Sequence, residues 1–485
     1  MDNRLKIQHL LWRAGFGPKH INSFQLKNST VKETLNNIFS ATQKPVKKFN
    51  VAKNLVAEYF SNESNLESIN KKAKQNRGEI NSIKMQMRQA SKEDLKTLNN
   101  LWVNEMINSD DQLREKMSLF WHGHFACRLP AGYYQQELLN IIRQNSLGNF
   151  GDLLIAVSKS PAMLSFLNND KNRKKSPNEN FAREVMELFT MGRGHYSETD
   201  VKEAARAFTG WSVNPLLEFD VREFLHDNGE KKFLGHTGNL SGDDVLNILL
   251  QQKQTAKFIT EKIYRYFVNE KINDERIKFL SEKFYNSNYN ISGLMMEIFS
   301  SEWFYDQENI GVKIKSPVEL IAGIRRMMPL TPRSESAQII FQKILGQVLF
   351  FPPNVAGWPG GTNWIDSSTL MARLQVPRVW AGKEILKLIP KGDDDVDMGK
   401  EERRKVNKGD VKRAGDSEIE WDKVYAIFEK VNREDLADAI SRSFLQVPLS
   451  FSKDILNKYT DSQSRQNFIS SSIIQIMSTP EYQVC

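Results

Sequence analysis

Residues 197–210 read SETDVKEAARAFTG, and this stretch contains a complete helix signal. Ser197 stands at an N-cap position with Asp200 three residues later, which is the spacing of a capping box. Small and apolar side chains then recur at helical intervals until Gly210, a residue type that commonly ends helices. The stretch therefore predicts a capped helix with one face in the core.

The same kind of signal continues in both directions along the chain. Residues 241–250, SGDDVLNILL, repeat the cap and the apolar spacing, and another helical pattern follows Thr255. Residues 101–124 contain a stripe of large side chains at helical spacing that ends in an imidazole: Leu113, Met117, Phe120, Trp121 and His124. These patterns predict a mainly α protein with a multi-helix globular body.

Two segments break the helical pattern. Residues 222–235, REFLHDNGEKKFLG, hold Asp-Asn-Gly between two short mixed segments, which predicts a small β-hairpin with His226 and Asp227 at its turn. Residues 350–364, FFPPNVAGWPGGTNW, are rich in glycine, proline and tryptophan and predict an irregular loop.

Composition divides the chain into three parts. Residues 1–390 form the expected main helical body, from which the polar residues 66–99 project as a helical arm bent near Gly78. Residues 391–420 contain almost no large apolar side chains, so we expect a flexible charged insertion. Residues 421–485 return to helical period and are expected to pack on the body as a C-terminal segment.

Overall composition excludes several classes of protein. With 40% hydrophobic and 26% charged residues, the chain is typical of a soluble globular protein. The net charge of +8 is spread among acidic neighbours, so nucleic-acid binding is not expected. No run is apolar for long enough to span a membrane, and the first twenty residues lack a secretory signal. A cytoplasmic location is therefore expected, with export by a partner as the alternative. The two cysteines are expected to stay reduced.

Histidine and acidic residues at three places form the candidate reaction centre, because imidazole and carboxylate groups are common ligands of divalent metals. We predict His122, His124 and Glu184 as the ligands of one metal ion of unknown identity. Glu187 would be a bridging carboxylate or a base, and His226 a proton shuttle oriented by Asp227.

This prediction depends on local geometry, and each group has a structural alternative. His122 and His124 lie about 200° apart on an ideal helix, so a shared ion requires the helix to end near Gly123. Otherwise both rings are hydrogen-bonded core groups. Glu184 and Glu187 can pair instead with nearby arginines (Arg183, Arg193 or Arg206), and Asp227 can form an Asx-turn.

Eight ordered motifs resemble the bacterial family catalogued as domain of unknown function 1800, over nearly the whole chain. They are HLLWRAGFGP, FWHGHF, NENFAREVMELFTMG, AARAFTGW, HDNGEKKFLG, SPVEL, FFPPNVAGWPGGTNW and STPEYQ. The resemblance implies a predominantly helical fold. It also implies a possible partner, because members of the family are often encoded beside sulfatase-like proteins. Many members look exported, and this chain departs from them in showing no leader.

Two functions are therefore expected to compete. The first is a hydrolase-like enzyme that uses a divalent metal in a His/Glu/Asp pocket. The alternative is a non-enzymatic interaction or scaffold protein that works with a sulfatase-like partner, in which the polar cluster is purely structural. No catalytic role follows from the resemblance, because the family is defined without an activity.

Overall fold

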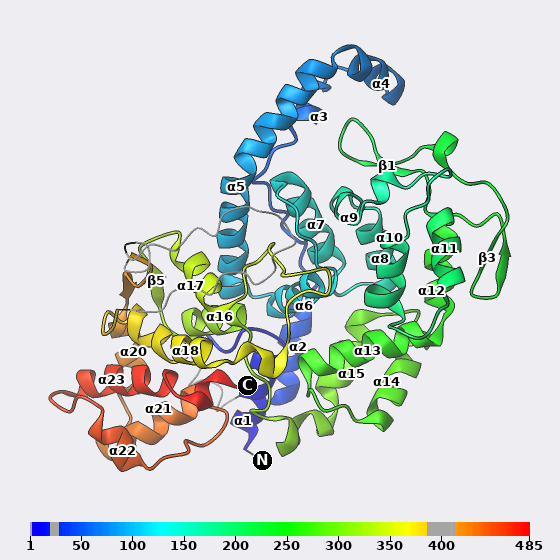
Figure 1. The fold of residues 1–485 in the computed structure, drawn as a ribbon. Coiled ribbons are helices and arrows are strands. Elements are labelled where there is room, and N and C mark those ends of the chain that lie inside the picture. The colour runs from blue at the N-terminus through cyan, green and yellow to red at the C-terminus, as the bar shows by residue number, and fades with distance from the viewer. Residues whose placement is uncertain (1, 20–28, 386–408, 410–412) are drawn as a thin grey trace.

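The computed structural model describes residues 2–19, 29–385, 409 and 413–485, and it is mainly α-helical (Figure 1). The predicted fold class is confirmed. The N-terminal helices are α1 (Asn3–Arg13), α2 (Val31–Ala41), α3 (Leu55–Tyr59), α4 (Leu66–Gln75), α5 (Arg77–Asn108), α6 (Gln112–His124), α7 (Gly132–Asn145), α8 (Phe150–Ser158), α9 (Pro161–Phe166), α10 (Asn180–Glu184) and α11 (Glu198–Ala207). The later helices are α12 (Gly242–Gln251), α13 (Lys253–Phe267), α14 (Asp274–Asn286), α15 (Ile291–Ser300), α16 (Pro317–Met327), α17 (Ala337–Leu345), α18 (Ser367–Trp380), α20 (Trp421–Phe428), α21 (Leu436–Phe444), α22 (Lys453–Lys458) and α23 (Arg465–Met477).

Local capping explains why several of these helices begin where they do. Ser197 accepts a hydrogen bond from the Asp200 amide, and the Asp200 carboxylate accepts one from the Ser197 amide, which completes the predicted capping box. Ser241 and Asp244 form the same reciprocal pair at the start of α12. Each box satisfies amide groups that have no partner within the helix.

Two large hydrophobic clusters make up the core of the body. The first, which we call the α8–α15 cluster, also takes side chains from α1, α2, α6 and α7. The second, the α16–α23 cluster, also takes side chains from α1, α5, α6 and α7. Helix α6 therefore lies between them: Met117 and Trp121 belong to the first, and Leu119 to the second. This position accounts for the nearly complete burial of α6.

The β-strands of the described residues are short and form antiparallel pairs. They join β1 (Trp211–Val213) to β2 (Phe219–Val221), β3 (Lys231–Phe233) to β4 (His236–Gly238), and β5 (Leu330–Pro332) to β6 (Ser417–Ile419). The predicted hairpin is therefore present but displaced. Its turn is Leu234-Gly235, where both residues have positive φ, rather than the segment around Asp227.

Residues 66–99 comprise α4 and about the first two thirds of α5, which extend away from the body (Figure 1). The break between the helices falls at Asn76, two residues before the predicted bend at Gly78. A small cluster that includes Phe60, Ile69 and Ile80 packs α4 against the first turns of α5. The rest of the arm has few buried side chains.

The C-terminal helices share a core with the rest of the chain. Residues 421–485 contribute Val424, Ile440 and Ile473 to the α16–α23 cluster, together with side chains of α5 and α16. Most of the predicted insertion, residues 391–420, lies outside the described residues, and its described end supplies β6. Within the described part of the chain, no helix is both long and apolar enough to cross a membrane.

Candidate functional site

Helix α6 does not end at Gly123, as a shared metal site would require. It continues through His124, and Phe125 is its C-cap. Residues that are two positions apart on a helix differ by about 200° in direction, so the imidazoles of His122 and His124 leave opposite sides of α6. The ring of His122 faces Trp102 and Phe350 of the α16–α23 cluster, whereas the ring of His124 faces the α8–α15 cluster.

His122 is a buried, neutral acceptor. Its Nε2 accepts a hydrogen bond of 3.2 Å from the Phe350 amide at the start of the 350–364 loop. Its ring also lies 5.5 Å from that of Trp358, in the same loop. Burial lowers the pKa of His122 to about 3, because a charged ring would have to leave water. The imidazole thus connects α6 to the glycine-rich loop.

His124 forms a hydrogen-bonded chain with Lys262. Its Nε2 donates to the Phe189 carbonyl at 3.2 Å, and its Nδ1 accepts from the Lys262 ammonium at 3.3 Å. Lys262, on α13, also donates to the Leu188 carbonyl at 3.1 Å. Both carbonyls lie at the C-terminal end of the π-helical turn Val185–Thr190, and the last carbonyls of a helix have no partner within it. His124 and Lys262 therefore cap this turn.

Burial sets the charge states of this chain. It lowers the pKa of Lys262 to about 8, and burial followed by repulsion from Lys262 lowers the pKa of His124 well below its ordinary value. The Nδ1 atom of a neutral His124 can accept a hydrogen bond from the Lys262 ammonium, whereas a protonated ring has no free acceptor.

Acid is therefore expected to destabilise the protein through these histidines. When the pKa of a histidine is lower in the folded protein than in the unfolded chain, the unfolded chain binds a proton first as the pH falls. The free energy of unfolding is therefore highest at pH values above the unfolded pKa of about 6.5, and it decreases as the pH falls below that value. Between pH 7 and pH 5 we expect the free energy of unfolding to drop by about 2 kcal/mol for each of His122 and His124, and by a similar amount for His9, whose pKa is also lowered by burial. Urea unfolding at the two pH values measures the drop, and His122→Gln should remove about a third of it. Equal stability at both pH values would contradict the assignment.

Glu184 and Glu187 lie one turn apart, but their surroundings differ. Glu187 hydrogen-bonds with Arg193 and accepts from the Tyr196 hydroxyl at 3.0 Å. Burial alone would raise its pKa, yet these partners hold it below the ordinary value. Burial, and then repulsion from Glu187, raises the pKa of Glu184. Of the three arginines considered from the sequence, Arg193 is the one that pairs with these acids.

His226 and Asp227 lie in the irregular segment between the two hairpins, not at a hairpin turn. The His226 Nδ1 donates to the Thr209 carbonyl at 2.8 Å. Asp227 accepts two hydrogen bonds from Arg206, of 2.8 and 3.2 Å, which hold its pKa below the ordinary value. It also accepts from the Gly229 amide at 2.8 Å, so the predicted Asx-turn is present.

The six predicted residues thus occupy separate environments. Glu184 and Glu187 are neighbours, as are His226 and Asp227, but the two imidazoles of α6 face different clusters. In the described ranges no group of three or more His, Cys, Asp or Glu side chains is placed to hold a metal ion. The predicted ligand set His122, His124 and Glu184 does not fit one ion, and metal binding itself stays a prediction.

The 350–364 loop is irregular, as predicted, and it packs directly on α6. Gly357 has φ of +86°, and a Cβ at this position would lie 2.3 Å from the Gly123 carbonyl oxygen. A side chain therefore meets both backbone strain and a backbone clash.

We expect Gly357→Ala to lower the free energy of unfolding by about 2 kcal/mol, through the positive φ and the displacement of the loop from α6. Gly360→Ala is the matched control, since Gly360 has an ordinary φ of −100° and open space at its Cβ. Thermal melting of both variants measures the difference. Similar losses for both variants would contradict the close packing of Gly357 on α6.

Sequence reasoning missed two sets of buried charged residues. Lys262 caps the π-helical turn, yet it lies 138 residues from His124 and no motif marks it. Glu319 binds the ammonium groups of Lys116 at 2.5 Å and Lys313 at 2.9 Å. The motif SPVEL does signal Glu319 as a capping residue of α16, but it does not reveal the lysines.

Comparison with known proteins agrees with the eight motifs. The family model described as "Protein of unknown function (DUF1800)" matches residues 9–484. The chain belongs to the DUF1800 family. No curated protein and no solved structure matches it significantly. For this DUF1800 protein, the functional argument therefore rests on its own geometry.

Proposed function

We propose that this DUF1800 protein is a non-enzymatic interaction protein that holds a partner protein on its projecting arm, residues 66–99. The single observation that carries the proposal is the arm itself, a basic helical projection that leaves the body (Figure 1). The candidate catalytic groups support it in a second way, because most of them are engaged by partners within the fold.

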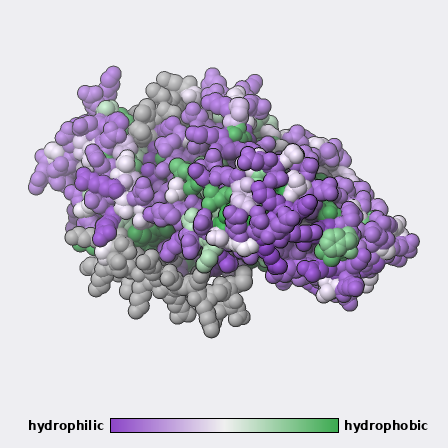
Figure 2. Space-filling model, turned by 90° about the horizontal axis from the view of Figure 1, so that it is seen from above, coloured by the Kyte–Doolittle hydropathy of each residue, from purple (hydrophilic) through white to green (hydrophobic). Residues whose placement is uncertain are grey.

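The lower part of α5 belongs to the body, whereas the arm contributes little to the core. Trp102, Val103 and Met106 are fully buried in the α16–α23 cluster, but Met85 in the arm is 63% exposed. A mostly polar helix that extends beyond the core gains little from burial. Seen from above, the surface is mainly hydrophilic, with separate small hydrophobic areas, among them one toward its centre and one near its right-hand edge (Figure 2).

Charge indicates what kind of surface the arm fits. It carries eight lysine and arginine residues against four acidic ones, an excess of four that is half of the net charge of +8. The exposed cations include Lys71, Lys74 and Arg77 near the tip. Complementary charge speeds association and selects the partner, so we infer a partner with an acidic face.

A sulfatase-like protein is the partner we propose. This choice rests on the family resemblance, since members of the family are often encoded beside such proteins. The test is a binding titration between the full-length chain and the sulfatase-like protein of the same genome, at low and high salt. We expect binding that weakens with salt, because exposed charges are screened.

Charge reversal on the arm makes the test specific. Lys71→Glu, Lys74→Glu and Arg77→Glu together should weaken binding at least about tenfold. The matched control reverses three exposed lysines on the body, Lys232, Lys271 and Lys278, and should leave affinity unchanged. Equal losses for both triple variants, no binding at all, or binding of the arm to a nucleic acid instead would overturn the proposal.

A metal-dependent hydrolase stays the competing prediction. Glu184 favours it, since its half-buried carboxylate has no hydrogen bond from another described residue. Glu187 is the acid beside it, and it is already engaged by Arg193 and Tyr196. Metal analysis of the purified protein, with Glu184→Gln as the comparison, distinguishes the two functions.

A further inference from the structure

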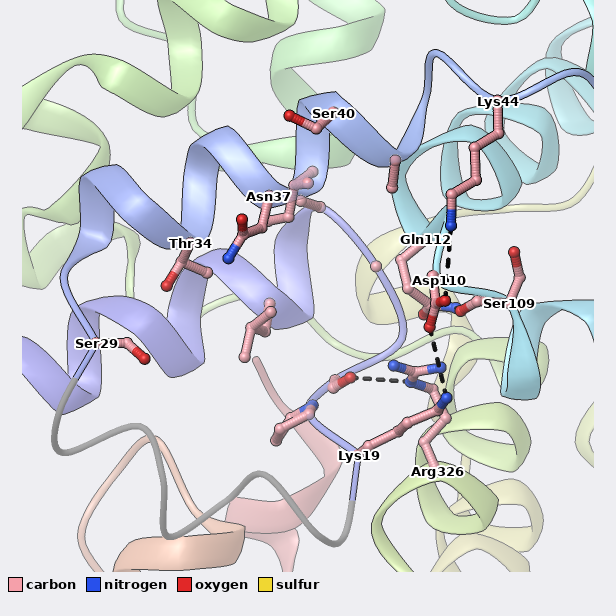
Figure 3. Close-up of a pocket in the computed structure, with 17 residues that line it drawn as sticks. Lys19, Ser29, Thr34, Asn37, Ser40, Lys44, Ser109, Asp110, Gln112 and Arg326 are labelled. Carbon is pink, nitrogen blue, oxygen red and sulfur yellow. Dashed lines mark hydrogen bonds and ion pairs between the residues drawn. The ribbon is translucent and has the colours of Figure 1, made fainter.

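A cavity of about 500 Å³ lies between the C-terminal end of α1, one face of α2 and the turn that joins α5 to α6 (Figure 3). Its volume is within the range of about 300–1,000 Å³ that is typical of small-molecule sites. It is separate from all six candidate residues discussed above, none of which lines it.

One wall of the cavity is apolar. Leu11 of α1, Ala14 at its C-cap, and Ile38 and Ala41 of α2 line this wall. Such a wall suits a hydrocarbon group, because burying it there removes apolar surface from water.

The turn after α1 directs a guanidinium toward the cavity. Gly17 has φ of +94°, and its carbonyl accepts a hydrogen bond of 2.9 Å from Nε of Arg326. Nη1 of Arg326 donates to the Ile107 carbonyl, and no hydrogen bond joins its Nη2 to another described residue. Arg326 is only 7% exposed, so its position is defined by the fold.

The polar wall carries an excess of positive charge. Asp110 lies between Lys19 and Lys44, with N···O distances of 3.6 and 3.8 Å, as Figure 3 shows. These ion pairs are long and exposed, and such pairs stabilise little. Three cations (Lys19, Lys44 and Arg326) therefore surround one carboxylate, and an anionic group could displace Asp110 from the lysines.

We propose that this cavity binds a small molecule that combines a hydrocarbon chain with a carboxylate or phosphate group. The hydrocarbon contacts the apolar wall of α1 and α2. The anionic group contacts Lys19, Lys44 and the free edge of Arg326, since guanidinium and ammonium groups both bind these anions.

The test titrates the full-length protein with octanoate and with octyl phosphate, with octanol and inorganic phosphate as comparison ligands, by isothermal titration calorimetry. We expect at least one of the two anionic amphiphiles to bind, and the tighter one identifies the head group. Octanol and inorganic phosphate should bind at least about tenfold more weakly, because each offers half of the recognised chemistry. Failure of both amphiphiles, or equal binding of octanol, would overturn the proposal.

Variants locate the binding in the cavity. Lys19→Gln with Lys44→Gln should weaken it about tenfold, Asp110→Asn should strengthen it about threefold, and Ala41→Leu should abolish it by filling the apolar wall. Lys32→Gln is the control, because Lys32 is an exposed residue of α2 that does not line the cavity. Unchanged affinity in the double lysine variant, or an equal loss in the control, would overturn the proposal. Since the arm is not involved, this test is independent of partner binding.

Discussion

Glu319→Gln is expected to lower the free energy of unfolding by about 3–5 kcal/mol, because it leaves buried lysines without their counter-ion. The Glu319 carboxylate binds Lys116 and Lys313, and its side chain is 1% exposed. Burial alone would raise the pKa of Glu319, but the two ammonium groups hold it well below its ordinary value. Glutamine preserves the shape and can still cap α16, so the change removes mainly the charge.

An exposed residue in the same role provides the control. Glu33 completes the capping box of α2 with Thr30, as Glu319 does for α16 with Ser316, but it has no buried lysine beside it. Glu33→Gln should therefore lower the free energy of unfolding far less than Glu319→Gln does, because exposed charges are screened by water. Urea unfolding of both variants measures the difference. A loss for Glu319→Gln no larger than that for Glu33→Gln would show that the buried cations do not depend on this carboxylate.

His124→Leu is expected to lower the free energy of unfolding by about 2–4 kcal/mol. The change leaves the Phe189 carbonyl without its donor and removes one acceptor of the Lys262 ammonium, in a buried position. Leucine occupies a similar volume, so lost packing contributes little. His195→Leu, at an exposed site, should change stability by less than about 0.5 kcal/mol.

A double-mutant cycle shows whether His124 acts through Lys262. If it does, Lys262→Met should cost less in the His124→Leu background than in the wild type, with a coupling of about 1 kcal/mol or more. Additive losses would mean that the histidine and the lysine stabilise the π-helical turn independently.

Most helices could be predicted because their signals are local. In each capping pair, Ser197 with Asp200 and Ser241 with Asp244, the two residues are three positions apart in the sequence. The apolar stripe of α6 likewise follows helical spacing. The hairpin turn was harder to predict, since Leu234 has a positive φ that leucine seldom adopts. Asp-Asn-Gly at 227–229 does form an Asx-turn, but a short 3₁₀ helix precedes it in place of a strand.

The candidate site was harder to predict because it depends on tertiary contacts. Spacing along the chain identifies His122 and His124 as neighbours, but only the uninterrupted helix sends them to different clusters. The arginine alternative was correct for Glu187, which binds Arg193, whereas the pairing of Asp227 with Arg206 was not predicted. Lys262 could not be found, because a lone lysine on α13 resembles any solvated residue until the fold places it against His124.

The most direct test of a structural role for His122 and His124 is urea unfolding of the wild-type protein. The protein is first treated with a chelator and is then measured before and after addition of Zn²⁺ or Mn²⁺. We predict the same unfolding midpoint in all samples, because hydrogen bonds within the protein hold both imidazoles of α6. A midpoint that rises with one bound ion per chain, and no longer rises in His124→Leu or Glu184→Gln, would contradict the structural role and restore the metal-dependent enzyme.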